Sequence, residues 1–252
     1  MGARSATALF LSLALAACAP ALVPSKPAVP PGAAALPAGF PAAEYERAAA
    51  RGQPVYRIDP ERSLVVVRVY RAGPLARFGH DHVVASRSIR GYALFATQGS
   101  RADLYAPLAA LTVDEPTLRA EAGMSTTPSA ADIEATRQNM LEKVLEVERF
   151  PFVTIDIEAS GGGADGLRAE ITLHGVSRTV PLSAEIARPD GEHALRARGR
   201  FSLRQTDFGM KPFSVLGGGL RVRDEVDVAF DVYGERIGPA SGADSPAAPG
   251  RH

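Results

Sequence analysis

The chain of 252 residues contains a single cysteine, and its 28 basic residues are balanced by 28 acidic ones. One cysteine excludes an internal disulfide framework and a metal cage built from several thiolates. Balanced charge gives no sign of the basic surface that a nucleic-acid groove requires, so nucleic acid is not an expected partner. No apolar run, including the short stretch 6–14, is long enough to cross a bilayer. The protein must therefore be stabilised by a hydrophobic core, which a chain of this length can build.

Sequence motifs of common enzymes are also missing. The chain holds no G-x-S-x-G, no P-loop and no H-E-x-x-H sequence. These motifs position the nucleophile, the phosphate or the zinc ion in large enzyme classes. We therefore expect a binding protein and not an enzyme.

The first residues are typical of an export signal. A basic residue, Arg4, precedes the short apolar stretch 6–14, and Leu15-Ala16-Ala17-Cys18 resembles the bacterial lipobox, in which the cysteine is lipidated. We predict a lipoprotein signal peptide over 1–17 and a lipid anchor on Cys18. Ala19, in place of an aspartate, favours the periplasmic face of the outer membrane in the bacterial cell envelope. The alternative is an ordinary signal peptide in which Cys18 is incidental.

Composition divides the rest of the chain. Residues 18–54 are rich in Ala and Pro and predict an extended tether, with a short helix over 44–51. Residues 234–252 predict a disordered tail. One domain, 55–233, remains between them.

Alternating hydrophobicity dominates this domain. From Leu220 to Val232 nearly every even position is apolar and most odd positions are polar, which predicts one long antiparallel strand. Residues 63–70 are apolar on both faces, so this strand is expected to be covered on both sides. Similar patterns predict further strands over 90–96, 102–106, 153–157, 167–173 and 195–203.

One segment breaks the β pattern. Apolar residues recur at helical spacing from Ile133 to Leu145, and Ser129 with Asp132 can cap the start of a helix. An antiparallel barrel removes the exposed edges that so many strands would otherwise leave. The predicted fold class is therefore all-β, an extended antiparallel β-barrel with one inserted α-helix and room for one small ligand.

Four segments resemble the YceI-like family of polyisoprenoid-binding, lipocalin-like proteins. They are 56–60 (YRIDP), 140–152 around the helix exit, 173–178 (LHGVSR), and 206–209 together with 222–226. The resemblance covers the domain and implies a lipocalin-like barrel with an elongated apolar pocket for an isoprenoid chain, in an exported protein. In one place the chain departs from the family pattern: where many members have a single histidine, it has Arg77-Phe78-Gly79-His80-Asp81-His82.

Two groups of residues are candidates for the ligand site. The apolar candidates are Met and Phe side chains, which adapt to a flexible ligand, and one Leu, although each could equally belong to the core: Phe78, Met140, Phe152, Phe208, Met210, Phe213 and Leu216. The polar candidates could bind a head group at the pocket mouth, or simply lie at the surface: Arg77, His80, His82, Arg137 and Lys211.

His80 and His82 have alternative interpretations. On an extended backbone their side chains point the same way, so they could chelate a metal ion. No third ligand stands nearby at a recognisable spacing, so we assign no metal site. A polar turn, in which Asp81 and the histidines bond to each other or to the backbone, is the simpler interpretation.

These observations predict a lipid-anchored carrier that sequesters an amphiphile with an isoprenoid tail, either a quinone or a polyprenyl lipid. The bound lipid would be its only cofactor, the membrane its partner through the anchor, and a homodimer is consistent with the family resemblance. One alternative is a metal-binding protein or enzyme that uses His80 and His82. A second is an envelope stress protein whose barrel is filled by its own side chains.

Overall fold

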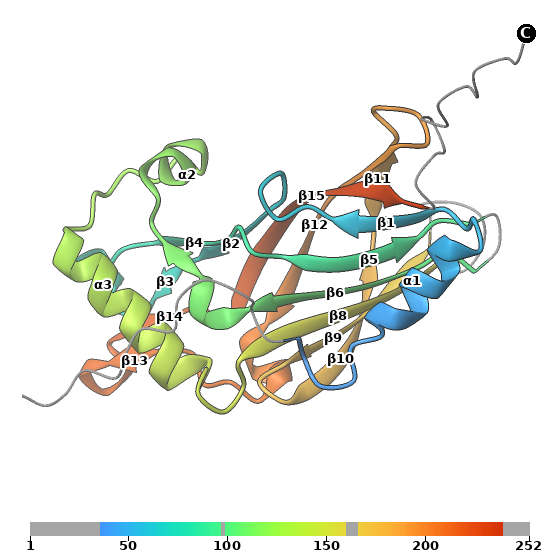
Figure 1. Ribbon diagram of the computed structural model, residues 1–252. Helices are drawn as coiled ribbons and strands as arrows, with labels where there is room; N and C mark the ends of the chain where they lie inside the picture. Colours follow the sequence, from blue (N-terminus) through green and yellow to red (C-terminus); the bar gives the residue numbers. More distant parts are fainter. Residues whose placement is uncertain (1–35, 97–98, 160–165, 239–252) are drawn as a thin grey trace, which may run out of the picture. The chain divides into compact units, whose positions relative to one another are not determined.

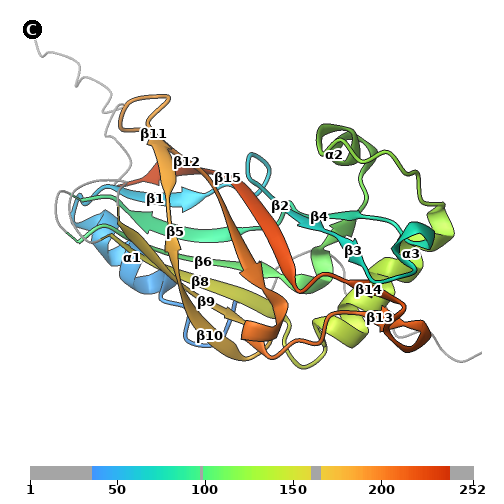
Figure 2. The ribbon, with the colours of Figure 1, turned by 180° about the vertical axis from the view of Figure 1, so that it is seen from behind.

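The computed structural model of the protein describes residues 36–96, 99–159 and 166–238. Antiparallel strands dominate it (Figures 1 and 2). The main sheet has 12 strands: β1 (Val55–Ile58), β2 (Leu64–Val69), β4 (His82–Ser86), β5 (Arg90–Leu94), β6 (Arg101–Pro107), β7 (Thr112–Val113), β8 (Phe152–Ala159), β9 (Leu167–Leu173), β10 (Val176–Leu182), β11 (Ala184–Ala187), β12 (Ala194–Arg204) and β15 (Glu225–Ile237). A second sheet joins β3 (Arg71–Ala72), β13 (Ser214–Val215) and β14 (Leu220–Val222). The predicted antiparallel β fold is confirmed.

The longest strand, β15, organises the main sheet. It pairs with β12 along one edge, and with β2 and then β1 along the other. From β1 the sheet continues through β5, β6, β8 and β9 to β10. Only Ser183 separates the end of β10 from β11, which pairs with β12. The bent segment of chain 176–187 therefore links β10, at one end of this strand order, to β12, which pairs with β15.

The predicted strand 220–232 is wrong in one respect. The chain breaks at residues 223–224, so that β14 belongs to the small sheet and β15 to the main one. Gln205 causes this break, because its side-chain amide donates to the Arg223 carbonyl at 2.8 Å. The Asp224 carboxylate also accepts from the Thr206 backbone amide at 2.9 Å. The backbone at Arg223 and the side chain of Asp224 are thus hydrogen-bonded to residues 205–206, and the chain leaves the β-ladder here.

Among the described residues there are three α-helices, one more than the inserted helix and the short helix over 44–51 that the sequence predicts. The inserted helix α3 (Ala130–Asn139) begins as expected, since Ser129 and Asp132 form a capping box, and it continues into a π-helical turn at Met140–Val144. The additional helix α2 (Pro116–Glu121) was not predicted; its Leu118 packs with Leu64 and Val66 over the outer face of β2. This contact explains why β2 is apolar on both faces.

Helix α1 (Ala42–Ala50) is the short helix expected over 44–51, but it is part of the folded unit and not of an extended tether. Its Tyr45 is fully buried and stacks on Tyr92 of β5, with ring centroids 5.3 Å apart. At the other end, β15 continues to Ile237. The folded unit therefore extends beyond 55–233 on both sides. None of the described helices is both long and apolar enough to cross a membrane.

Candidate functional site: an apolar cavity inside the sheet

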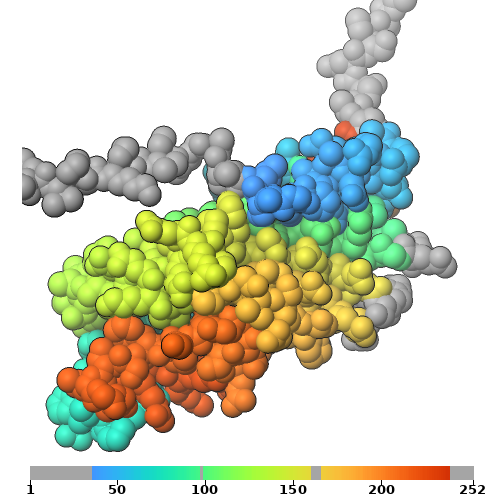
Figure 3. Space-filling model, turned by 90° about the horizontal axis from the view of Figure 1, so that it is seen from below, coloured from blue at the N-terminus to red at the C-terminus, as the bar shows by residue number. Residues whose placement is uncertain are grey.

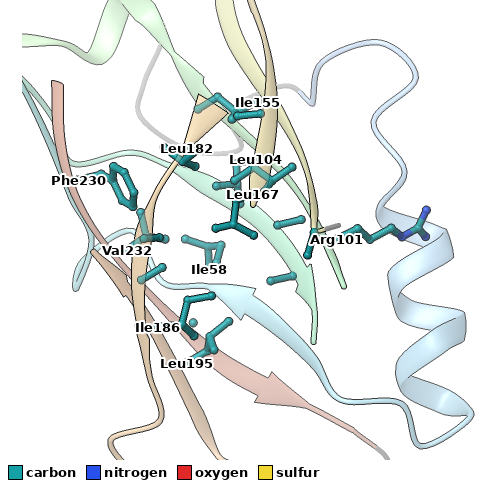
Figure 4. Close-up of a pocket in the computed structure, with 18 of the residues that line it drawn as sticks. Ile58, Arg101, Leu104, Ile155, Leu167, Leu182, Ile186, Leu195, Phe230 and Val232 are labelled. Atoms are coloured by element: carbon teal, nitrogen blue, oxygen red, sulfur yellow. The ribbon is translucent and has the colours of Figure 1, made fainter. Parts of the chain in front are cut away.

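The inner face of the main sheet encloses a cavity of about 170 Å³. One water molecule needs only about 10–15 Å³ on this measure, so the space can hold a much larger guest. Branched aliphatic side chains from strands far apart in the sequence converge on it (Figure 4). The residues labelled there are Ile58, Arg101, Leu104, Ile155, Leu167, Leu182, Ile186, Leu195, Phe230 and Val232.

The alternation of the strands explains this lining. In β15, Val228, Phe230 and Val232 face the cavity, and in β8 Ile155 and Ile157 do so. Successive side chains of a strand point to opposite faces, so these residues all lie inside while their polar neighbours lie outside. Phe230 and Ile155 keep some accessible surface although they lie inside the sheet, because part of their surface borders the empty space.

Polar groups occur at one end of the cavity. Among its lining residues only Ser100 and Arg101 carry polar side chains. The Ser100 hydroxyl donates to the Ala96 carbonyl at 2.7 Å, and the Arg101 guanidinium points away toward α1 (Figure 4), where it pairs with Glu44 at 3.1 Å. Just outside, the exposed Arg188 lies over the ring of the lining residue Phe95, 4.4 Å from its centroid. This end therefore combines an apolar wall with one cation, Arg188, at its rim.

None of the seven apolar candidates from the sequence lines this cavity. Phe208 and Met210 are buried in a core cluster that also contains the cavity residues Ala169, Ile171 and Leu182, and Met140 and Phe213 pack against that cluster. Phe152 instead makes an edge-to-face contact with Tyr105, with ring centroids 6.0 Å apart. Phe78 and Leu216 are exposed at the small sheet. Four of the seven candidates are thus core residues beside the cavity, Phe152 forms an aromatic contact, and Phe78 and Leu216 are surface residues.

The structure places the polar candidates away from the cavity as well. His82 Nδ1 lies 2.6 Å from the Asp114 carboxylate, whose side chain is fully buried. The same carboxylate accepts from Arg119 at 2.5 Å and from the Val83 amide at 3.0 Å. Burial alone raises the pKa of Asp114, but the hydrogen bonds from His82, Val83 and Arg119 together outweigh it and hold that pKa below its ordinary value. His82 is therefore a hydrogen-bond partner of the buried Asp114–Arg119 ion pair.

The other four polar candidates do not converge on one point. His80 lies beside His82, with ring centroids 6.3 Å apart, and its Nδ1 is buried without a hydrogen-bond partner among the described residues. Arg137 of α3 donates to the Leu111 carbonyl at 3.2 Å and to the Ala109 carbonyl at 2.8 Å, which fixes the helix to the preceding loop. Arg77 and Lys211 are exposed.

Two further expectations concern metal and lipid. Within the ranges that the structure describes, no group of three His, Cys, Asp or Glu side chains is arranged to hold a metal ion. Cys18, the expected lipidation site, lies outside the described residues.

The cavity wall could have been found in the sequence from the inward positions of the alternating strands. Val228, Phe230 and Ile155 all belong to strands that the pattern identifies. The local concentration of Phe and Met in the sequence instead marks the core that lies next to the cavity. Arg188 and Ser100 leave no signal in the sequence that distinguishes them from surface residues.

The fold and the site together define the class of protein: a mostly antiparallel β protein that encloses an apolar cavity. The chain belongs to the YceI-like domain family, whose model matches residues 56–233. No curated protein sequence matches it.

Solved structures agree on the fold. The chain is similar, at 14% identity, to a polyisoprenoid binding domain from Saccharophagus degradans implicated in plant cell wall breakdown, with a TM-score of 0.52 over 72% of this chain and 98% of that one. It is also similar to BcnA of Burkholderia cenocepacia, at 14% identity with a TM-score of 0.50 over 70% of this chain and 98% of that one.

Proposed function

We propose that the protein binds an amphiphile with an isoprenoid-type tail, a quinone or a polyprenyl lipid, and sequesters or carries it without chemical change. The observation that carries the proposal is the apolar cavity inside the main sheet. Its branched aliphatic wall suits a branched hydrocarbon chain, and each buried CH₂ group of the tail contributes about 0.8 kcal/mol before ordering costs. The name of the Saccharophagus degradans domain supports this ligand class.

The head group would lie at the polar end of the cavity. Arg188 stands there over the ring of Phe95, and Ser100 lines the same end. A guanidinium binds phosphate through paired hydrogen bonds, and it also interacts with a quinone ring or carbonyl. The residues proposed for the head group are thus different from those expected from the sequence.

The surrounding biology is part of the same proposal. An anchor on Cys18 would hold the carrier at the periplasmic face of the outer membrane. It would there face the aqueous periplasm, in which an isoprenoid lipid is insoluble without a carrier. The filled-barrel alternative predicts no cavity, and the space among Ile58, Leu104 and Val232 argues against it. The metal alternative finds no support among the described residues, where no group of three His, Cys, Asp or Glu side chains is arranged to hold an ion.

The test compares two substitutions on neighbouring strands. Ala197 of β12 lines the cavity, whereas Ala229 of β15 lies on the opposite face of the sheet. The full chain is expressed with export in a bacterial host, purified, and examined by native mass spectrometry for a bound lipid. We expect a bound isoprenoid mass in the wild type and in Ala229→Trp, and its loss in Ala197→Trp, because the indole fills the space.

The comparison has two outcomes that would overturn the proposal. Equal lipid occupancy in folded Ala197→Trp and Ala229→Trp would show that the lipid lies elsewhere. A wild-type protein that takes up no added quinone or polyprenyl phosphate would rule out the ligand class.

A further inference from the structure

The small sheet carries an unusual concentration of exposed apolar side chains. Of the four large hydrophobic residues that are exposed in the described chain, three lie here: Phe78 (66%), Val215 (37%) and Leu216 (72%). Phe78 ends the turn η1 (Ala76–Phe78), Leu216 begins the turn η5 (Leu216–Gly218), and Val215 precedes it at the end of β13. We call Phe78, Val215 and Leu216, with the cations described below, the loop surface.

Backbone pairing holds the two turns side by side. Strand β3, which precedes η1, pairs with β14, which follows η5. In addition, the Leu75 amide donates to the Gly219 carbonyl at 2.8 Å. The space-filling view shows these two segments in contact, cyan and orange, at the lower left of Figure 3. The apolar side chains therefore belong to one surface, although about 140 residues separate them in the sequence.

The charge of the same segments is one-sided. Residues 71–80 and 211–223 contain five basic residues and no acidic one, in a chain that is neutral overall. Three of these cations, Arg77, Lys211 and Arg221, are exposed and form no ion pair with any residue that the structure describes. The loop surface is thus apolar at its turns and positively charged around them.

The backbone at Leu216 adds a second observation. Leu216 has a φ of +53°, in the left-handed region that side-chain-bearing residues rarely adopt. The residue is nevertheless 72% exposed, so it contributes little to the core in return for this strain. A strained backbone that presents an apolar side chain to solvent suits a site of contact better than a structural element.

We infer that the loop surface docks onto an anionic lipid bilayer. Phe and Leu are among the side chains that enter a membrane most favourably, and each Lys or Arg near an anionic surface adds attraction. These three side chains offer much less area than a stable protein interface needs. The inference goes beyond the proposed function and does not depend on which lipid occupies the cavity.

Tryptophan fluorescence tests this contact locally. The chain contains no tryptophan, so Phe78→Trp places a single reporter on the loop surface. The full chain with Cys18→Ala, which cannot carry a lipid anchor, is mixed with vesicles of phosphatidylcholine alone or with phosphatidylglycerol added. We expect the emission to shift to shorter wavelength, and to be quenched by brominated lipid, only with the anionic vesicles.

A matched reporter is Thr179→Trp, on the exposed part of β10. It should show neither shift nor quenching under the same conditions. Equal responses of the two reporters would mean adsorption without a preferred face, and no response at Phe78→Trp would mean no contact. Either result overturns the inference.

Charge variants separate a membrane from another partner. In the Phe78→Trp background, Arg77→Gln with Lys211→Gln should weaken binding to anionic vesicles roughly 30-fold, since two cations near the surface are lost. Arg168→Gln with Arg200→Gln, two exposed cations elsewhere, is the control and should change it little. If the loop surface instead drives self-association, measured by light scattering and abolished by Phe78→Ser, it is an interface between copies of this chain and the inference fails.

Discussion

At the scale of single residues, Asp114 shows how one buried charge fixes the segment around His80 and His82. Its side chain has no exposed surface, and Arg119, which bonds to it, is only 8% exposed. Arg119 also donates to the Asp81 carbonyl at 2.8 Å, so the network ties α2 to the start of β4. The adjacent Asp81 is held in place by the same contacts. Of the two histidines that look like ligands in the sequence, His82 is therefore part of a structural network.

We expect Asp114→Asn to lower the free energy of unfolding by about 3–5 kcal/mol at pH 7, because Arg119 is left buried without its counter-ion. The pKa of Asp114 is depressed in the folded state. Its contribution is therefore present above the unfolded pKa, near about 3.9, and is lost as pH falls through the lower folded value. Urea unfolding of both proteins at pH 7 and at pH 3 measures this difference.

Glu235→Gln is the control, since Glu235 forms an exposed ion pair with Arg62 at 3.3 Å. That change should shift the free energy of unfolding by less than about 1 kcal/mol. If Asp114→Asn has as small an effect, the network does not stabilise the fold. The sequence could not reveal it, because Asp114 lies 32 residues from His82 and reaches it only through the pairing of β4 with β7.

At the scale of strands, the sequence pattern predicted faces well and partners poorly. Alternation correctly assigns Val228, Phe230 and Val232 to the inside. It continues unchanged through 220–232, however, where the chain leaves one sheet and enters another. A period of two records which side is buried and carries no information about the neighbouring strand. The break depends on Gln205, which is distant in sequence, and could not be predicted.

Gly199 lies where the bent segment 176–187 meets β12. A Cβ atom at this position would lie 2.5 Å from the Ser183 carbonyl oxygen and 2.5 Å from the Phe230 ring. We expect Gly199→Val to lower the free energy of unfolding by about 1–3 kcal/mol or more, because neither the backbone nor the ring can move freely. Thermal unfolding followed by circular dichroism measures the effect.

The matched change is Gly238→Val, where a Cβ atom would meet nothing within 4 Å. It should leave the unfolding temperature nearly unchanged. If Gly199→Val is as stable as Gly238→Val, the close approach of Ser183 to β12 is not required for the fold.

At the scale of the molecule, the family and the antiparallel fold could be predicted, and the location of the cavity could not. The apolar candidates have the composition of a ligand pocket, and a core packed from Phe208 and Met210 has the same composition. What distinguishes the cavity is the absence of side chains between walls such as Ile58 and Phe230. That absence depends on the curvature of the sheet, which follows from pairing and not from any local pattern.

The outer face of the sheet is held to α1 through an acidic row. Asp103, Asp156 and Glu170 stand opposite one another on β6, β8 and β9, and the Tyr45 hydroxyl of α1 donates to Asp103. Burial, followed by the hydrogen bond and charge of Asp103, raises the pKa of Asp156 to about 6. The raised pKa means that the folded state holds a proton on Asp156 which the unfolded chain has already lost. In this pH range the proton on Asp156 therefore adds to the free energy of unfolding. This contribution declines as pH rises from about 4 to about 6.

We therefore expect Asp156→Asn to unfold a few degrees above the wild type at pH 7.5, since repulsion between Asp103 and Asp156 is removed. At pH 4 the two proteins should unfold at nearly the same temperature, because Asp156 is then protonated in the wild type. Asp207→Asn, which removes an exposed carboxylate without hydrogen bonds or ion pairs among the described residues, is the control and should follow the wild type at both pH values. Differential scanning calorimetry across this range measures all three. A constant difference between Asp156→Asn and the wild type would show that the substitution acts through packing and not through the proton, and the acidic row would then have no part in the pH dependence of the molecule.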